Sequence, residues 1–135
     1  MIVDTSALLA YFDANEPRHA DVARVIDGAR SPLIVSPYVI AELDYLVLTR
    51  HGSDAELAVL DELTSGAWEL ADMTSARIRA ATEIVRRYAD QPIGLTDASN
   101  IVLAGAYRTR QIATLDRRHF EVLRFDDHTA VDILP

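Results

Sequence analysis

The sequence predicts a three-layer α/β domain in which helices cover both faces of a mostly parallel sheet. Short β-type runs alternate with longer helical runs, and glycine and proline fall singly where such elements should start or stop. No composition shift, linker or internal repeat divides the chain, so we expect one domain over residues 1–135. A chain of this length, 50% hydrophobic, is able to bury a core without cross-links.

Five short runs are the expected strands, at residues 1–3, 33–35, 68–70, 112–115 and 122–125. Six longer stretches have helical periodicity, at residues 5–12, 17–29, 37–50, 54–64, 75–88 and 97–107. Ser36 with Pro37 marks one helix entry, whereas Gly52 and Gly66 stand where helices should end. Because strands and helices alternate, the sheet is expected to be parallel and buried on both sides.

The composition excludes several classes of chemistry. The absence of cysteine removes disulfides, thiolate nucleophiles, zinc fingers and iron–sulfur clusters. All 13 positively charged residues are arginine, which excludes Schiff-base lysines, phosphate-loop lysines and lysine general bases. No apolar stretch is long enough to span a bilayer and no targeting segment opens the chain, so we expect a cytoplasmic protein without membrane contact.

Acidic residues near the ends of the expected strands indicate a site. In parallel α/β sheets, ligands bind beyond the carboxyl ends of the strands, where the strand order reverses. Asp4 follows the first strand and Asp116 follows the fourth, so both carboxylates are expected at one edge. Asp97 would begin a helix that opens toward the same edge, although taken alone it is better explained as a charge that stabilises the helix dipole.

Glu42 interrupts a helix that is apolar almost all round. Glu42 and Asp44 are its only charges between residues 38 and 48, and at about 100° per residue they point roughly 200° apart. Leu43 and Leu46 lie beside Glu42 on an apolar face, which predicts that Glu42 is buried. Since a buried carboxylate is costly unless it is paired or binds a metal, an arginine ion pair and a metal site both remain open.

Three or four converging carboxylates, without lysine or cysteine, indicate a site for a hard divalent cation. Oxygen ligands favour Mg²⁺ or Mn²⁺ over zinc and copper. The histidines show no spacing typical of a shared metal and are expected to be surface or packing residues: His19, His51, His119 and His128. Dinucleotide, phosphate-loop and serine-elbow motifs are also absent, which leaves metal-assisted phosphoryl or phosphodiester chemistry.

Four short motifs occur in one order along the chain, VDTSALL at 3–9, AEL at 41–43, LTDA at 95–98 and ATLDRRHF at 113–120. Together they resemble the PIN-domain ribonucleases and, over essentially the whole chain, the VapC-type toxins of bacterial toxin–antitoxin pairs. The resemblance implies a five-stranded parallel sheet and an Mg²⁺- or Mn²⁺-dependent endoribonuclease that a cognate antitoxin holds inactive. It also implies a homodimer, and a catalytic, metal-binding quartet of Asp4, Glu42, Asp97 and Asp116.

Several neighbours of the four acids are weaker candidates for the site. Thr5, Ser6 and Thr114 resemble the family's hydroxyl positions and would orient carboxylates or water, although capping explains Thr5 and Ser6 equally well. Asn100 stands one helical turn after Asp97, where some relatives carry a further acid. It would act only as a neutral ligand or hold a water.

Arg117 and Arg118 are candidates for contact with substrate. A net charge of -8 disfavours non-specific binding of nucleic acid, because arginine and lysine contacts to phosphate supply most of that affinity. Metal ions and a local positive rim at these arginines would offset the charge for one strand of RNA. We therefore expect a particular or structured RNA as the target.

Two other functions remain open from the sequence. A Mg²⁺-binding phosphoacceptor signalling domain also places carboxylates at strand ends, but it normally needs a lysine, which this chain lacks. A catalytically inert PIN-like binding module would share the fold, although unneeded buried carboxylates are costly. An antitoxin would place an arginine or lysine among the acids and dock on apolar stripes of the helices at 17–29 and 54–64, unless those stripes are core.

Overall fold

The computed structural model describes all 135 residues and contains a five-stranded sheet with the strand order β3-β2-β1-β4-β5. The strands are β1 (Ile2–Val3), β2 (Ile34–Val35), β3 (Glu69–Leu70), β4 (Gln111–Ala113) and β5 (Asp132–Leu134). Every neighbouring pair is parallel. The predicted five-stranded parallel sheet is therefore confirmed.

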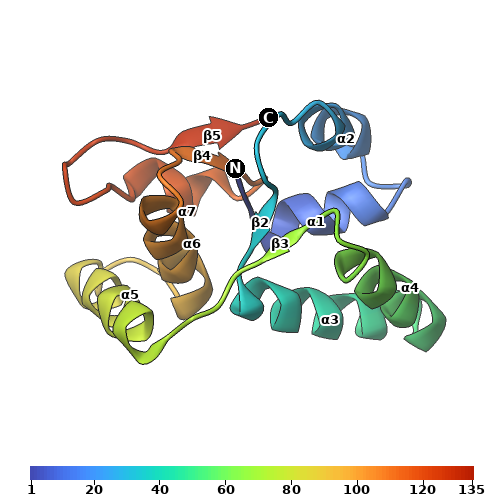
Figure 1. Ribbon diagram of the computed structural model, residues 1–135, viewed down its shortest axis with the longest axis horizontal. Helices are drawn as coiled ribbons and strands as arrows, with labels where there is room; N and C mark the ends of the chain where they lie inside the picture. Colours follow the sequence, from blue (N-terminus) through green and yellow to red (C-terminus); the bar gives the residue numbers. More distant parts are fainter.

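Seven helices surround the sheet (Figure 1). They are α1 (Thr5–Phe12), α2 (His19–Asp27), α3 (Pro37–His51), α4 (Ser53–Leu63), α5 (Ser75–Arg87), α6 (Leu95–Ala106) and α7 (Arg117–Val122). Helices α1 to α4 cover one face of the sheet and α5 to α7 cover the other (Figure 1). The predicted three-layer α/β architecture is confirmed, and none of its helices has the length and apolarity needed to cross a bilayer.

The strands are short, yet the three central strands β2, β1 and β4 each contribute to two separate cores. Ile2 and Ile34 pack into the core beneath α5 to α7, whereas Val3 and Val35 pack into the core beneath α1 to α4. This division follows from the alternation of side chains along a strand. It explains why β1 and β2 are continuously apolar, as expected of strands covered on both faces.

The predicted strand at residues 122–125 is wrong. Helix α7 ends at Val122, and the fifth strand comes later in the chain, as β5. Phe120 and Leu123 are 1% and 0% exposed and lie three residues apart, so they pack as one helical face continued into the following turn. The β-branched and aromatic content of this stretch suggested a strand, but packing against the sheet determined the outcome.

The strand order reverses between β1 and β4. From β1 the chain adds β2 and β3 on one side, then returns to add β4 and β5 on the other. Asp4 directly follows β1, and Asp116 lies at the N-terminus of α7, beyond the carboxyl end of β4. Both acids therefore stand at the crevice where ligands bind in doubly wound sheets.

Candidate active site

Four carboxylates line a cavity of about 310 Å³ at the carboxyl edge of the sheet. They belong to the four acids that the sequence singled out, Asp4, Glu42, Asp97 and Asp116. Thr5, Ser6 and His119 also line the cavity. No three of its acidic and imidazole groups already converge as the ligands of one ion do, so side chains would rotate inward on metal binding.

Asp4 is the most buried of the four acids, at 5% exposed. Its Oδ1 accepts a hydrogen bond from Asn100 Nδ2 at 3.0 Å, and its Oδ2 accepts from the hydroxyls of Ser6 and Thr114 at 2.9 and 2.8 Å. Burial raises the pKa of Asp4 and the charge of Asp97 raises it further, whereas the hydroxyl donors lower it. Hydrogen bonds thus hold the carboxylate in place, although its burial and the nearby charge of Asp97 disfavour its ionised form.

Ser6 and Thr114 connect the two halves of the cavity. Their hydroxyl oxygens lie 3.0 Å apart, and each also accepts a backbone N–H, from Leu115 at 2.9 Å and from Asp116 at 3.0 Å. These bonds fix the segment that follows β4 against the start of α1. Neither hydroxyl caps a helix, so the alternative interpretation of Ser6 as a capping residue is wrong.

Asn100 is fully buried on α6, and its amide group is only half satisfied. Its Nδ2 donates to Asp4, but its Oδ1 has no hydrogen-bond partner. An orphan buried carbonyl is unusual and marks a place where a water or a ligand would gain a bond. The structure thus ties Asn100 to the first carboxylate rather than to the third, which it follows in sequence.

The prediction that Glu42 is buried is wrong, because the side chain is exposed. The buried line of α3 runs through Val39, Leu43 and Val47, so Glu42 lies beside that line and reaches the cavity. Its Oε2 accepts a hydrogen bond from Thr5 Oγ1 at 2.6 Å. The arginine pair left open by the sequence is absent.

The sequence predicted that Asp97 begins a helix, but α6 begins two residues earlier, and Asp97 is its third residue. Its Oδ2 accepts the backbone N–H of Gly94 at 3.0 Å, so it does stabilise the helix start. Burial raises the pKa of Asp97, the bond from Gly94 lowers it, and the charge of Asp116 raises it. Asp97 therefore stabilises the N-terminus of α6 and also lines the cavity.

His119 is the residue that sequence reasoning missed. Its Nδ1 lies 3.5 Å from Asp97 Oδ2 and 3.4 Å from Asp116 Oδ2, so the ring sits between two of the acids. The available signal was its position three residues after Asp116, which is one helical turn. That signal was hidden because the helix α7 was not predicted.

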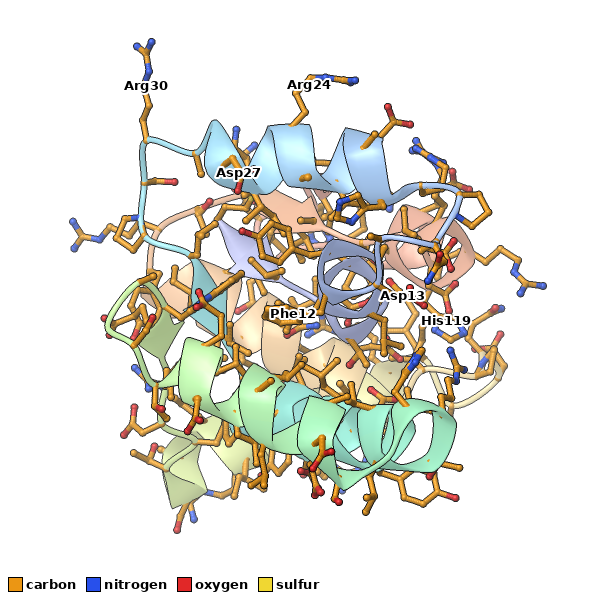
Figure 2. All side chains as sticks on the ribbon, turned by 90° about the vertical axis from the view of Figure 1, so that its right-hand side faces the viewer. Phe12, Asp13, Arg24, Asp27, Arg30 and His119 are labelled. Atoms are coloured by element: carbon orange, nitrogen blue, oxygen red, sulfur yellow. The ribbon has the colours of Figure 1, made fainter.

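No arginine neutralises the cavity. The thirteen arginines form ion pairs only with acids outside the quartet, or none at all. Two of them, Arg24 and Arg30, point away from the rest of the chain (Figure 2). The four carboxylates repel one another without compensation from a side-chain cation other than His119, and this all-carboxylate donor set is suited to a divalent metal ion.

Arg117 and Arg118 are the first two residues of α7, directly after Asp116, but do not line the cavity. Arg117 bonds to Glu121 and to the carbonyl of Pro135, at 3.5 and 3.2 Å. Arg118 is exposed and has no ion-pair partner, which leaves its guanidinium available. Of the two arginines, Arg118 is therefore the better placed to meet a phosphate.

A larger hollow of about 860 Å³ lies elsewhere, between α5, α6 and the loop before β5. Its cations are largely paired, since Arg110 bonds to Asp127 at 2.9 Å and Arg87 lies 3.7 Å from Asp126. Its three carboxylates, Glu83, Asp126 and Asp127, are all paired with arginines, and no histidine lines it. This hollow is the larger of the two, but the four unpaired carboxylates make the smaller cavity the candidate active site.

Replacing Asn100 by aspartate is expected to destabilise the metal-free protein by about 3 kcal/mol at about pH 8, because a second buried carboxylate would face Asp4. The pKa of the new acid would be raised above its unfolded value, so this loss shrinks as the pH falls and the acid becomes neutral. Urea unfolding with chelator at about pH 5 and about pH 8 measures the difference. Gln91→Glu, on an exposed turn, is the matched control. An equal loss at both pH values would contradict the link to Asp4.

The comparisons with known proteins agree with this geometry. The PIN domain family model matches residues 1–126. The chain belongs to the PIN-domain family. Over 124 residues this PIN domain is 65% identical to Ribonuclease VapC26 of Mycobacterium tuberculosis, and the match covers 92% of each protein.

Solved structures share the fold of this PIN domain at low identity. The toxin VapC20 of Mycobacterium tuberculosis, which is described as cleaving the sarcin-ricin loop, superposes with a TM-score of 0.83 at 20% identity. That match covers 99% of this chain and 98% of the toxin. VapBC2 of Rickettsia felis, bound to promoter DNA, superposes with a TM-score of 0.72 at 15% identity, covering 99% and 98%. These structures show that the architecture tolerates wide sequence divergence.

Proposed function

We propose that this PIN domain is a metal-dependent endoribonuclease and the toxin of a toxin–antitoxin pair. The observation that carries the proposal is a cavity lined by four carboxylates without an arginine partner, at the reversal point of the sheet. The 65% identity to a protein named a ribonuclease supports the RNA substrate. An RNA target in turn supports a location in the cytoplasm.

The quartet would hold Mg²⁺ or Mn²⁺, with Asp4, Glu42, Asp97 and Asp116 as ligands and as the catalytic acids. When bound, such an ion activates water and stabilises the charge that develops on a phosphodiester under in-line attack. The protein's own contribution is to hold its carboxylates in place. Thr5 orients Glu42, while Ser6, Thr114 and Asn100 fix Asp4 through three hydrogen bonds.

The substrate would approach over α7. Arg118 is exposed there without an ion pair and would contact a phosphate next to the scissile bond, with Arg117 behind it. Because the chain carries a net charge of -8, such local contacts cannot give strong general affinity for nucleic acid. A particular RNA, bound at few phosphates, fits this charge distribution.

The apolar stripes expected to bind an antitoxin are largely core. Val22, Ile26 and Leu63 are buried, and of the stripe on α4 only Leu57 is strongly exposed, at 58%. Only the less buried part of those stripes, Val25, Leu57 and Leu60, is therefore free to contribute to a docking groove, which stays a prediction. We retain the antitoxin as a partner because the chain is 65% identical to a VapC protein. A cation inserted from the antitoxin would compete with metal among the four acids.

The homodimer implied by the family resemblance also remains a proposal. Its support in the structure is an exposed apolar stripe on α3, where Tyr45 is 66% and Leu48 is 43% exposed. These side chains explain why α3 is apolar almost all round although only one line of it is buried. Sedimentation equilibrium of the isolated chain would determine the oligomeric state.

Expression of the chain alone is expected to arrest growth, and co-expression with the short open reading frame beside its gene is expected to restore it. The physical reason is that antitoxin binding would block the acidic cavity, so the two proteins should also co-purify. Asp4→Asn, expressed alone, is the matched control and should leave growth unchanged. A lack of growth arrest together with a failure to co-purify would contradict the toxin role without affecting the nuclease role.

The nuclease itself is tested by incubating purified protein with cellular RNA and Mn²⁺, then sequencing the new 5′ ends. Cleavage at a small set of sites, absent with Asp4→Asn, is the expected result. No cleavage of any RNA would favour the inert binding module instead.

A further inference from the structure

The imidazole of His119 lies inside the acidic cavity, unlike the other three rings. Its Nδ1 is 3.5 Å from Asp97 Oδ2 and 3.4 Å from Asp116 Oδ2, and its side chain is only 27% exposed. His51 is 41% exposed and lies 3.7 Å from Asp13, outside the cavity. His119 is thus the one histidine of the four that lines the acidic cavity.

The two distances from His119 Nδ1 to the acids are somewhat longer than the separation of two ligands bound to one ion. Two ligands at right angles, with bonds of about 2.1 Å, are separated by about 3 Å. The distances from Nδ1 to the two carboxylates, 3.5 and 3.4 Å, exceed this value by about 0.5 Å at most, which small side-chain rotations would remove. The three groups do not yet converge on one point, but small rotations of their side chains would bring the nitrogen and two oxygens around one ion.

The fold holds His119 in this position. Asp116 is the N-cap of α7 and His119 lies in its first turn, so one short helix carries two of the three donors. The next residue, Phe120, is 1% exposed in the core and anchors that helix to the sheet. The imidazole is therefore presented by a packed element and not by a loose loop.

We propose that His119 Nδ1 is a further metal ligand, and that the resulting mixed nitrogen–oxygen site prefers Mn²⁺ to Mg²⁺. The inference rests on the proposed metal-dependent function and adds a specificity that four carboxylates alone would not provide. Mg²⁺ strongly favours an all-oxygen shell, whereas first-row transition ions accept imidazole. A nitrogen donor at this position thus penalises Mg²⁺ selectively.

Mn²⁺ binding to untagged full-length protein tests the proposal without measuring activity. Pulsed EPR of the Mn²⁺ complex is expected to show ¹⁴N modulation from a directly bound nitrogen, and to lose it in His119→Asn. By titration calorimetry, wild type is expected to bind Mn²⁺ at least about tenfold more tightly than Mg²⁺. His119→Asn is expected to lose most of this difference, with Mg²⁺ affinity changed by less than about threefold. His51→Asn is the matched control and should behave as wild type.

The possible failures are distinguishable. Mn²⁺ bound by wild type without nitrogen modulation would overturn the role of His119 while leaving the metal site intact. A rise in Mn²⁺ affinity in His119→Asn would also overturn it, since the ring would then compete with the ion. No binding of either metal would instead overturn the proposed function. Because the spectrum of wild type is decisive alone, a variant that misfolds does not weaken the test.

Discussion

Asp4→Asn is expected to reduce metal-dependent RNA cleavage by roughly two orders of magnitude or more, as removal of a central catalytic group does in other enzymes. The amide removes a negative charge from the most buried acid of the quartet, so it weakens metal binding where the protein holds its ligand most rigidly. Cleavage of a labelled RNA under single-turnover conditions, with Mn²⁺, is the measurement. Asp61→Asn, exposed on α4, is the matched control and should retain full activity.

The same variant is expected to melt at a higher temperature than wild type when no metal is present. The hydroxyls of Ser6 and Thr114 can donate to the amide oxygen, and Asn100 can rotate so that its unpartnered Oδ1 accepts from the new NH₂ group. The network therefore survives, while the repulsion with Asp97 disappears. A folded variant with full cleavage activity would contradict the assignment of Asp4.

The pH dependence of metal-free stability has a definite sign. Burial raises the pKa values of Asp4 and Asp97 above those of the unfolded chain, so the native state takes up protons first as the pH falls. The contribution of these two acids to stability is fully present below their unfolded pKa values and is lost as the pH rises through their folded ones. In Asp4→Asn the free energy of unfolding should depend less on pH. Urea unfolding in chelator, at pH values from below the unfolded pKa of aspartate to above the folded ones, would measure this.

Removal of divalent metal is the second change with a large expected effect. Excess chelator is expected to stop cleavage, and added Mg²⁺ or Mn²⁺ to restore it, with no requirement for zinc. The reason is that four carboxylates without an arginine partner supply no permanent positive charge to stabilise the charge that develops on a phosphodiester. Undiminished cleavage in excess chelator would be decisive against the metal-dependent mechanism.

Metal binding is also expected to stabilise the fold, by about 2.7 kcal/mol when the free ion is at about one hundred times its dissociation constant. Thermal melting with and without Mn²⁺ measures this gain. Asp97→Asn is expected to lose much of it, whereas Asp61→Asn should keep it. Equal stabilisation of all three proteins would indicate that Mn²⁺ binds outside the cavity.

The sequence was most informative where chain position and spatial position coincide. Asp4 follows a strand directly, and any parallel sheet places such a residue at its carboxyl edge, so its location was predictable. Glu42 was harder, because a helix that is apolar all round does not reveal which line of residues is buried. That choice depends on the neighbouring helices.

His119 could not be placed for a related reason. Its role in the cavity depends on α7, a six-residue helix whose stability comes from burying Phe120 and not from local propensity. The stretch that follows it is rich in β-forming residues, which led to a strand at 122–125 and displaced the true fifth strand, β5. Tertiary packing determined both the helix α7 and the position of β5, and local sequence patterns do not reveal such packing.

The hydrogen bonds of Asp4 also constrain when activity arises during synthesis. Its partners Asn100 and Thr114 lie 96 and 110 residues further along the chain. Contacts of such long range form only once the intervening chain has been made and closed into a loop. A nascent chain that ends before residue 100 lacks the last acid of the quartet and both of these hydrogen-bond partners of Asp4. The acidic cavity is therefore assembled only together with the completed sheet, and we expect partly synthesised chains to lack cleavage activity.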